Sequence, residues 1–222
     1  MGPAMVGGIT GASAGRGAPP QAFRGPGTPL ADADVARAAA ALGCEPAVLS
    51  AVIAVETGGR GGFLDEAPPR RPRILFEAHV FSRLTAGRWD ASHPGLSRPR
   101  WGGPGTYGPA GAHQHERLAH AAALNGPAAL QACSWGLFQI LGENHRLCGF
   151  EDPESFARAM ARDEAAQLDA FLAFVRARGL VPLLRARDWT AFARRYNGPG
   201  QAGNRYDARL AAAYERHAVE EA

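Results

Sequence analysis

The sequence contains no lysine, so all 24 of its Lys and Arg residues are arginine. This absence excludes enzymes that need a lysine amine, such as Schiff-base enzymes, P-loop nucleotidases and enzymes with a Ser-Lys dyad. The sequence also lacks a run of about 18 consecutive apolar residues, the length that a membrane-spanning helix needs. We therefore expect no membrane partner.

Cysteine is scarce, with Cys44, Cys133 and Cys148 as the three examples. Their odd number and the lack of a CxxC pair argue against a disulfide framework and a structural zinc site. The net charge is +3 and the pI about 9.0. The arginines are dispersed and are not interleaved with aromatic residues, which argues against nucleic acid and is compatible with a polyanionic or cell-wall partner.

Large apolar side chains are almost absent from residues 1–29, which are rich in glycine and proline. Such a composition cannot offset the entropy cost of ordering the chain, so we expect a flexible leader there. The leader shows no secretory signal peptide. Residues 30–222 are expected to form one domain.

The rest of the chain is mainly helical in pattern, with an irregular region at 60–112 that contains a β-like run at 73–76. This pattern predicts a predominantly helical α+β fold with a small irregular β region. The expected helices are 34–42 behind Asp32, 46–57, a short one ending at 84, 113–124, 127–133, 135–144, 153–160 behind Asp152, one from about 163 to 179, one through 195 behind Asp188, and 205–217.

Glu56 is the most informative residue because it falls in the apolar stripe of the 46–57 helix, beside Leu49 and Val52. A buried carboxyl group either has a cationic partner or keeps its proton, and a raised pKa suits a general acid. The alternative is a helix-end Glu that points to solvent or pairs with Arg60 or Arg73.

Glu77 is the second candidate, since it directly follows the apolar run that ends at Phe76. A carboxylate there would emerge at an edge or cleft, although it could equally cap the following helix. Four further acids, Asp65, Glu66, Asp90 and Glu143, lie in polar or glycine-containing surroundings typical of solvated surface charges.

A possible zinc motif at His113, His115, Glu116 and His120 has the wrong spacing, because the His-Glu pair is followed by His after five positions rather than four. We expect a polar, solvated helix face and no metal.

Two segments combine aromatic rings with amide or hydroxyl groups, as sugar-binding clefts require. One runs from Ser134 through Trp135 to Gln139 and on to Asn144, and the other contains Tyr196 and Asn197. Core packing explains the aromatic residues equally well.

Four motifs together resemble the N-acetylmuramidase domain of phage endolysins and some secreted bacterial effectors. They are AVETGGRGGF at 54–63, ILFEAHVF at 74–81, SWGLFQI at 134–140 and YNGPG at 196–200, and the resemblance covers about 30–217. It implies a lysozyme-like fold and hydrolysis of the bond between N-acetylmuramic acid and N-acetylglucosamine. One departure is Thr57, where the family usually has Ser.

The family's catalytic Glu matches Glu56, and the Glu of its strand-to-helix motif falls on Glu77, a base or stabiliser with Asp65 and Glu66 as rivals. The residues expected to bind substrate are Ser134, Trp135, Gln139, Asn144, Tyr196 and Asn197. The resemblance implies no metal or organic cofactor, a monomer that acts on peptidoglycan glycan strands, and action at the periplasmic or extracellular wall after release from the cytoplasm. Two alternatives are a lytic transglycosylase, which forms a 1,6-anhydro sugar, and a non-catalytic wall-binding module.

Overall fold

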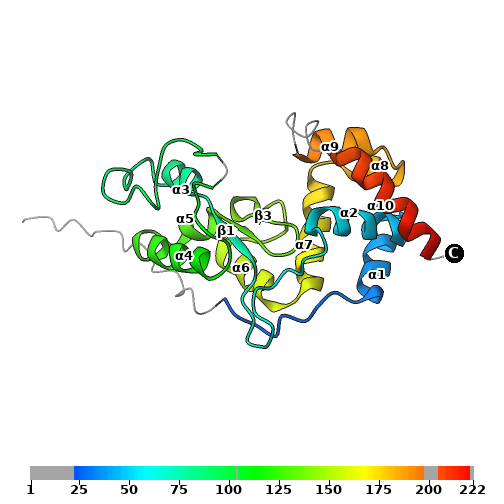
Figure 1. The fold of residues 1–222 in the computed structure, drawn as a ribbon, viewed down its shortest axis with the longest axis horizontal. Coiled ribbons are helices and arrows are strands. Elements are labelled where there is room, and N and C mark those ends of the chain that lie inside the picture. Colours follow the sequence, from blue (N-terminus) through cyan, green and yellow to red (C-terminus); the bar gives the residue numbers. More distant parts are fainter. Residues whose placement is uncertain (1–22, 104, 198–204, 221–222) are drawn as a thin grey trace, which may run out of the picture.

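A computed structural model describes residues 23–103, 105–197 and 205–220. In the described part, helices gather at the two ends of the molecule and a small sheet lies between them (Figure 1). The helices are α1 (Asp32–Leu42), α2 (Pro46–Thr57), α3 (Ala78–Leu84), α4 (Ala112–Leu124), α5 (Gly126–Gln131), α6 (Pro153–Arg162), α7 (Glu164–Ala177), α8 (Val181–Arg185), α9 (Trp189–Asn197) and α10 (Tyr206–Glu220).

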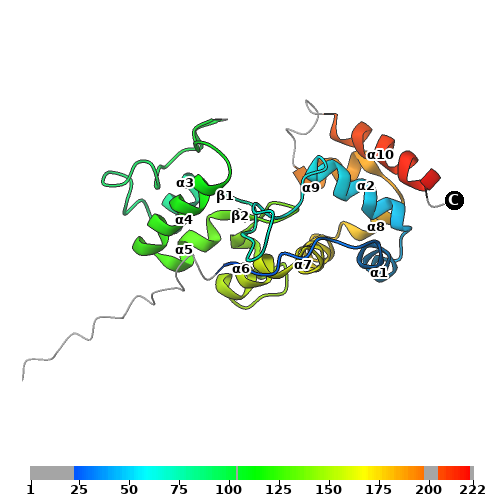
Figure 2. The same ribbon diagram turned by 60° about the horizontal axis from the view of Figure 1, so that its bottom comes forward.

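The sheet has three short antiparallel strands in the order β1 (Ile74–Phe76), β2 (Cys133–Trp135) and β3 (Ile140–Leu141). Ile74 pairs with Trp135, and Ser134 pairs with Leu141. Helices α3, α4 and α5 lie at one end of the sheet, and α1, α2, α8, α9 and α10 gather at the other end of the molecule (Figures 1 and 2). This confirms the predominantly helical α+β fold.

Local sequence signals explain where several helices begin and end. The side chain of Asp152 accepts a hydrogen bond from Ser155 N, and that of Asp188 accepts one from Ala191 N, so both predicted caps are confirmed. Helix α2 starts at Pro46 and stops at Gly58, whose φ of 56° is left-handed. Helix α1 begins at Asp32 itself, with Ala31 as its N-cap residue.

The predicted helix at 135–144 is wrong. Residues 133–141 form the β2–β3 hairpin, and a short 3-10 helix follows at Gly142–Asn144. The turn needs left-handed backbone at Gly136 and Gln139, with φ of 67° and 47°. Helical periodicity alone does not reveal this, because a short apolar run fits a buried strand as well as a helix.

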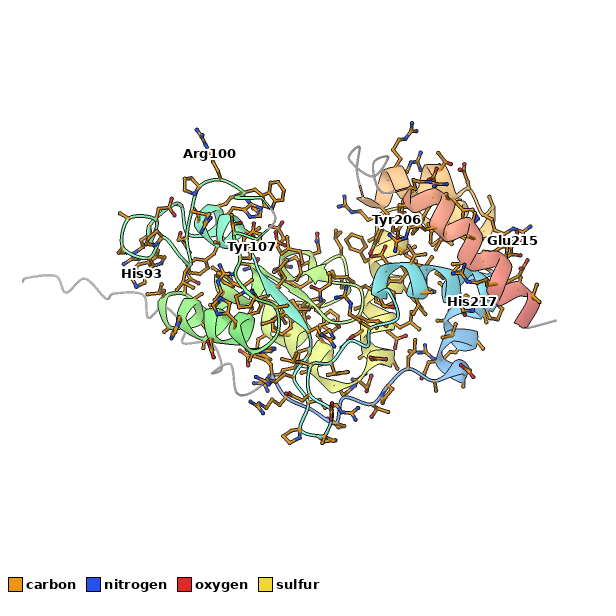
Figure 3. The ribbon with its side chains drawn as sticks, viewed as in Figure 1. His93, Arg100, Tyr107, Tyr206, Glu215 and His217 are labelled. Atoms are coloured by element: carbon orange, nitrogen blue, oxygen red, sulfur yellow. The ribbon has the colours of Figure 1, made fainter. Side chains whose placement is uncertain are left out.

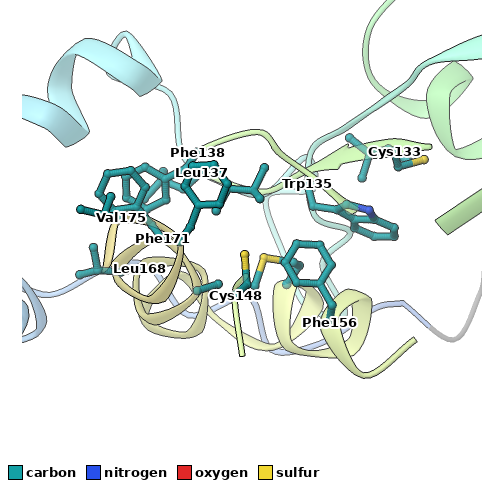
Figure 4. Close-up of a cluster of buried hydrophobic side chains, with 14 of the residues drawn as sticks. Cys133, Trp135, Leu137, Phe138, Cys148, Phe156, Leu168, Phe171 and Val175 are labelled. Carbon is teal, nitrogen blue, oxygen red and sulfur yellow. The ribbon is translucent and has the colours of Figure 1, made fainter. Parts of the chain in front are cut away.

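The core joins the sheet to α6 and α7 (Figure 4). Phe138 stacks on Phe171 with ring centroids 4.2 Å apart, and Trp135, Phe156 and Leu168 are buried nearby. No single helix in the described part has the length and apolar character of a membrane span, and α1 and α2 reach it only as a pair with a bend of 114°.

Residues 23–29, which belong to the predicted leader, pack against the domain. Phe23 is buried and meets the ring of Trp135 edge-on at 5.8 Å. Gly25 bridges to Arg70, and Thr28 bridges to Asp163. Residues 1–22 lie outside the described part.

Candidate active site

Glu56 lies in the last turn of α2, where Gly58 and Gly59 turn the chain away from the helix. Its neighbour Val55 is buried, while the Glu56 side chain is partly buried. The helix therefore presents a carboxyl group from apolar surroundings at the point where the backbone leaves the helix.

Burial is the main influence on the Glu56 carboxyl group, and it raises the pKa. Two weaker influences lower the pKa: the Tyr206 hydroxyl donates a hydrogen bond to Glu56 Oε1, and the charge of Arg209 lies nearby. Tyr206 comes from the start of α10, beside α2 (Figure 3). In the described residues no arginine pairs with Glu56 within 4.0 Å, so the alternative of a pair with Arg60 or Arg73 is not what the structure has.

Two cavities meet at Glu56. The first cavity has a volume of about 270 Å³ and is lined by the end of α2, the loop through Leu64, β1, residues 108–114 and the turn at 136–139. The second cavity, of about 370 Å³, lies between the β2–β3 hairpin, α7 and Tyr196. Among the described residues that line either cavity, Glu56 alone carries a carboxyl group.

Three of the predicted substrate-binding residues lie at these cavities. Gln139 lines both, and its side chain is exposed, with Nε2 donating to Gly136 O at 2.8 Å. Its left-handed φ of 47° is uncommon for a residue other than glycine and is typical of functional sites. Asn144 and Tyr196 line the second cavity. The structure thus places Gln139, Asn144 and Tyr196 around cavities that Glu56 also lines, and Glu56 is the carboxyl group that the sequence singled out.

The Tyr196 ring stacks on Phe192 at 5.4 Å, and its phenol has a pKa well above its usual range, because of burial first and the nearby Glu56 charge second. Asn197 ends α9. The glycine and proline that follow it in the motif, Gly198 to Gly200, lie outside the described residues.

Glu77 is at the N-cap position of α3, directly after β1, but it does not line the two cavities. Its Oε1 accepts a hydrogen bond from Ser134 Oγ at 3.0 Å, and its Oε2 is 3.8 Å from His79 Nε2. The His79 ring is in turn 2.9 Å from the Tyr107 hydroxyl. Ser134 is buried and therefore holds Glu77 in place instead of facing a ligand.

Trp135 must be corrected from a sugar-binding residue to a core residue. It is 1% exposed, and its indole Nε1 donates to Leu130 O at 3.1 Å. The ring is enclosed by the hydrophobic core, where Phe23 meets it edge-on with ring centroids 5.8 Å apart. A sugar ring cannot stack on a side chain in this position.

The rival acid Asp65 is committed to an ion pair. Its carboxylate is 2.6 Å from Arg71 Nη2 and also accepts from the Arg71 backbone, and these contacts lower the pKa of Asp65 to about 2. Its neighbour Glu66 is exposed. Neither lines the two cavities.

The histidine cluster on α4 differs from the expected solvated face at one residue. His115 is buried, with Nε2 2.9 Å from Pro72 O, and burial lowers its pKa. In the described residues no group of three or more His, Cys, Asp or Glu side chains is placed to hold a metal ion. The cysteines are unpaired, and burial raises the pKa of Cys148 to about 12, which disfavours the reactive thiolate.

Sequence reasoning missed Tyr206, the hydrogen-bond partner of Glu56. Its position is 150 residues further along the chain, in the helix that packs most extensively on α2. No local pattern marks it, because an aromatic residue at the start of an amphipathic helix is typical of a core position.

Comparison with known proteins adds three findings. The family model for N-acetylmuramidase matches residues 45–218. A crystal structure of the Burkholderia AP3 phage endolysin is 40% identical over 87% of this chain and 72% of that chain, with a TM-score of 0.77. No match was found among curated proteins.

Proposed function

Since the chain belongs to the N-acetylmuramidase family and is a peptidoglycan hydrolase with a lysozyme-like fold, we propose that it hydrolyses the β-1,4 bond between N-acetylmuramic acid and N-acetylglucosamine. The observation that supports this reaction is the raised pKa of Glu56 at the junction of two cavities. Glycan strands of peptidoglycan are the proposed partner, and a single copy of the chain carries the site.

Glu56 acts as the general acid. Its carboxyl proton passes to the glycosidic oxygen as the bond to the muramic carbon breaks and that carbon gains oxocarbenium character. The Tyr206 hydroxyl then stabilises the carboxylate left on Glu56, because it donates a hydrogen bond to that oxygen. Burial raises the pKa and so favours the protonated acid before the step, and the hydrogen bond limits the free-energy cost of ionisation.

Hydrolysis is completed by a water molecule, whose oxygen bonds to the muramic carbon while a proton leaves it. Glu77 is our choice for the second carboxylate, either as the base that takes this proton or as the stabiliser of the oxocarbenium centre. It follows β1 directly, and β1 contributes Ile74 and Leu75 to the wall of the first cavity. Ser134 fixes the orientation of its carboxylate. A separation of about 5–5.5 Å between the two carboxyl groups would give retention, and one of about 6.5–9.5 Å would give inversion.

A lytic transglycosylase is the second candidate, because Glu56 is the one carboxyl group that lines the cavities in the described part of the chain. Such an enzyme uses a hydroxyl of the muramic residue itself as the nucleophile, so it needs no second carboxylate. Mass spectrometry of digested peptidoglycan separates the two reactions, since a 1,6-anhydro product is lighter by one water than the product of hydrolysis.

The substitution Glu56→Gln tests the proposed acid. We expect a loss of lytic activity of at least about 100-fold, as is usual when a general acid is removed. Glu215→Gln, an exposed acid on α10, is the matched control and should retain activity. Full activity of Glu56→Gln would contradict the role of Glu56. If the wild-type chain binds the wall without lysing it, and Glu56→Gln binds equally well, the chain would instead be a wall-binding module.

The raised pKa of Glu56 also predicts how the stability of wild type and of Glu56→Gln depends on pH. A carboxyl group whose pKa is raised in the folded chain ionises more readily in the unfolded chain, so the wild type loses stability as the pH rises from the ordinary pKa through the folded value. Glutamine does not ionise. The thermal midpoints of wild type and Glu56→Gln should therefore agree at low pH, and at neutral pH the variant should be equal or higher.

The place of action follows from the substrate. Peptidoglycan lies outside the cytoplasmic membrane, and the chain resembles an endolysin, so we propose that it acts on the cell wall after release from the cytoplasm.

A further inference from the structure

The first cavity contains positive charge that the proposed acid chemistry does not use. Arg60 and Arg73 both line it, and Glu56 supplies its one carboxyl group among the described lining residues. In the described part of the chain, neither arginine has a carboxylate within 4.0 Å. The two arginines therefore give this cavity positive charge that no carboxylate pairs with in the described residues.

The loop that carries Arg60 is held in place from both sides. Arg73 Nε donates to Gly61 O at 2.9 Å, and the backbone N of Arg73 donates to Gly62 O at 2.8 Å. The N–H of Gly62 donates to the buried Glu164 carboxylate at 2.6 Å. These hydrogen bonds join the loop that carries Arg60 to Arg73, so the backbone positions of the two arginines are fixed relative to each other.

Arg73 is also fixed to the opposite wall of the cavity. Its carbonyl oxygen accepts a hydrogen bond from Gly136 N at 2.8 Å, in the turn that presents Gln139. Its side chain is held as well, by the hydrogen bond from Nε to Gly61 O, which leaves the two Nη groups to bind an anion. Because the side chain is already ordered, it loses less conformational entropy when it binds a carboxylate.

The proposed substrate carries carboxylates close to the bond that breaks. The lactyl ether of N-acetylmuramic acid is on C3 of the same sugar whose C1 reacts, and it ends either in its own carboxylate or in a stem peptide with carboxylates. Arg60 follows Glu56 by four residues and lines the same cavity. A group on C3 of a sugar whose C1 lies at Glu56 would therefore occupy the same cavity as Arg60 and Arg73.

Resting on the proposed function, we propose that Arg60 and Arg73 bind the carboxylate-bearing substituent on C3 of the muramic residue. The pair would select muramic-containing glycan over a neutral polymer of N-acetylglucosamine. Attraction between exposed charges is screened by salt, so this selectivity should fall as the ionic strength rises.

Binding measured in the Glu56→Gln chain tests the proposal without cleavage of the ligand. Three tetrasaccharides serve as probes: one with stem peptides, one with free lactyl carboxylates, and neutral chitotetraose. We expect the neutral probe to bind about tenfold more weakly than the better carboxylate-bearing probe, and Arg60→Gln to remove that advantage. If Arg60→Gln weakens binding of the probe with free lactyl carboxylates, the arginines bind the lactyl group. If it weakens binding of the probe with stem peptides, they bind a carboxylate of the stem peptide.

Arg216→Gln is the matched control, because Arg216 is an exposed arginine on α10 that lines neither cavity. Arg60→Lys should keep part of the advantage, since it keeps the charge. Arg73→Gln, checked for an unchanged thermal midpoint, should act like Arg60→Gln. Equal binding of all three probes, or equal losses in Arg60→Gln and Arg216→Gln, would overturn the proposal. Failure of the wild-type chain to cleave any glycan would instead reject the proposed function.

Discussion

At the scale of single residues, the site depends on two opposing influences on Glu56. Burial raises the pKa of its carboxyl group, and the hydrogen bond from Tyr206 lowers it. Burial is the larger influence, so the acid stays protonated to a higher pH than an exposed Glu. The hydroxyl of Tyr206 therefore tunes the acid, while the apolar end of α2 determines the direction of the shift.

Tyr206→Phe should raise the pKa of Glu56 further, because it removes a hydrogen bond that favours the charged form. A general acid must carry its proton, so activity falls as the pH rises through its pKa. The alkaline limb of kcat/KM should move to higher pH in this variant. Tyr214→Phe, whose hydroxyl bonds Glu45 on the surface, is the control. A shift of the limb to lower pH would refute the assignment.

At the scale of elements, helix α7 holds the turn that faces Glu56. Gln167, 1% exposed, accepts from Leu137 N at 2.6 Å and donates to Met160 O at 2.7 Å. The approach is so close that a Cβ on Gly136 would lie 2.5 Å from Gln167 Cδ. The glycine in the β2–β3 turn is thus required by packing as well as by its left-handed φ.

Gln167→Leu keeps most of the side-chain volume but leaves the N–H of Leu137 and the carbonyl of Met160 without this partner. Leaving two buried polar groups unpaired should lower the free energy of unfolding by about 2–4 kcal/mol. Urea denaturation measures this change. Gln131→Leu, on the surface of α5, should change stability by no more than about 0.5 kcal/mol. A loss no greater than that of Gln131→Leu would show that α7 does not hold the turn.

At the scale of the whole molecule, the segment from Phe23 to Leu30 links the sheet to α1 at one end of the molecule. It starts against Trp135 in the sheet and runs beneath α6 and α7 to α1 (Figure 1). On its way, Leu30 N donates to Glu164 Oε2 at 2.8 Å. The same carboxylate holds Gly62 through its other oxygen, so the segment and the loop after α2 share one buried anchor.

Phe23→Ala should destabilise the protein by about 3–5 kcal/mol, the usual cost of removing a buried phenyl ring. Calorimetry should show a clearly lower thermal midpoint. The control is Val219→Ala, because Val219 is 77% exposed and should tolerate the change. An unchanged midpoint in Phe23→Ala would mean that the segment is not part of the cooperative fold.

The sequence alone determined the features that depend on near neighbours in the chain. Helix caps at Asp152 and Asp188, the stop of α2 at Gly58 and the apolar surroundings of Glu56 could all be read from spacing within one or two helical turns. These features rest on hydrogen bonds and side-chain periodicity over a few residues, which the order of amino acids specifies directly.

Only the tertiary structure decided which of the candidate residues line a cavity with Glu56. Trp135 and Tyr196 both lie in aromatic motifs, yet the first is enclosed by the hydrophobic core and the second lines a cavity with Glu56. Tyr206 reaches Glu56 because α10 packs along α2, and no local pattern encodes that contact. Burial and hydrogen bonding at the site depend on contacts between distant segments, and their free energy exists only once those segments have packed.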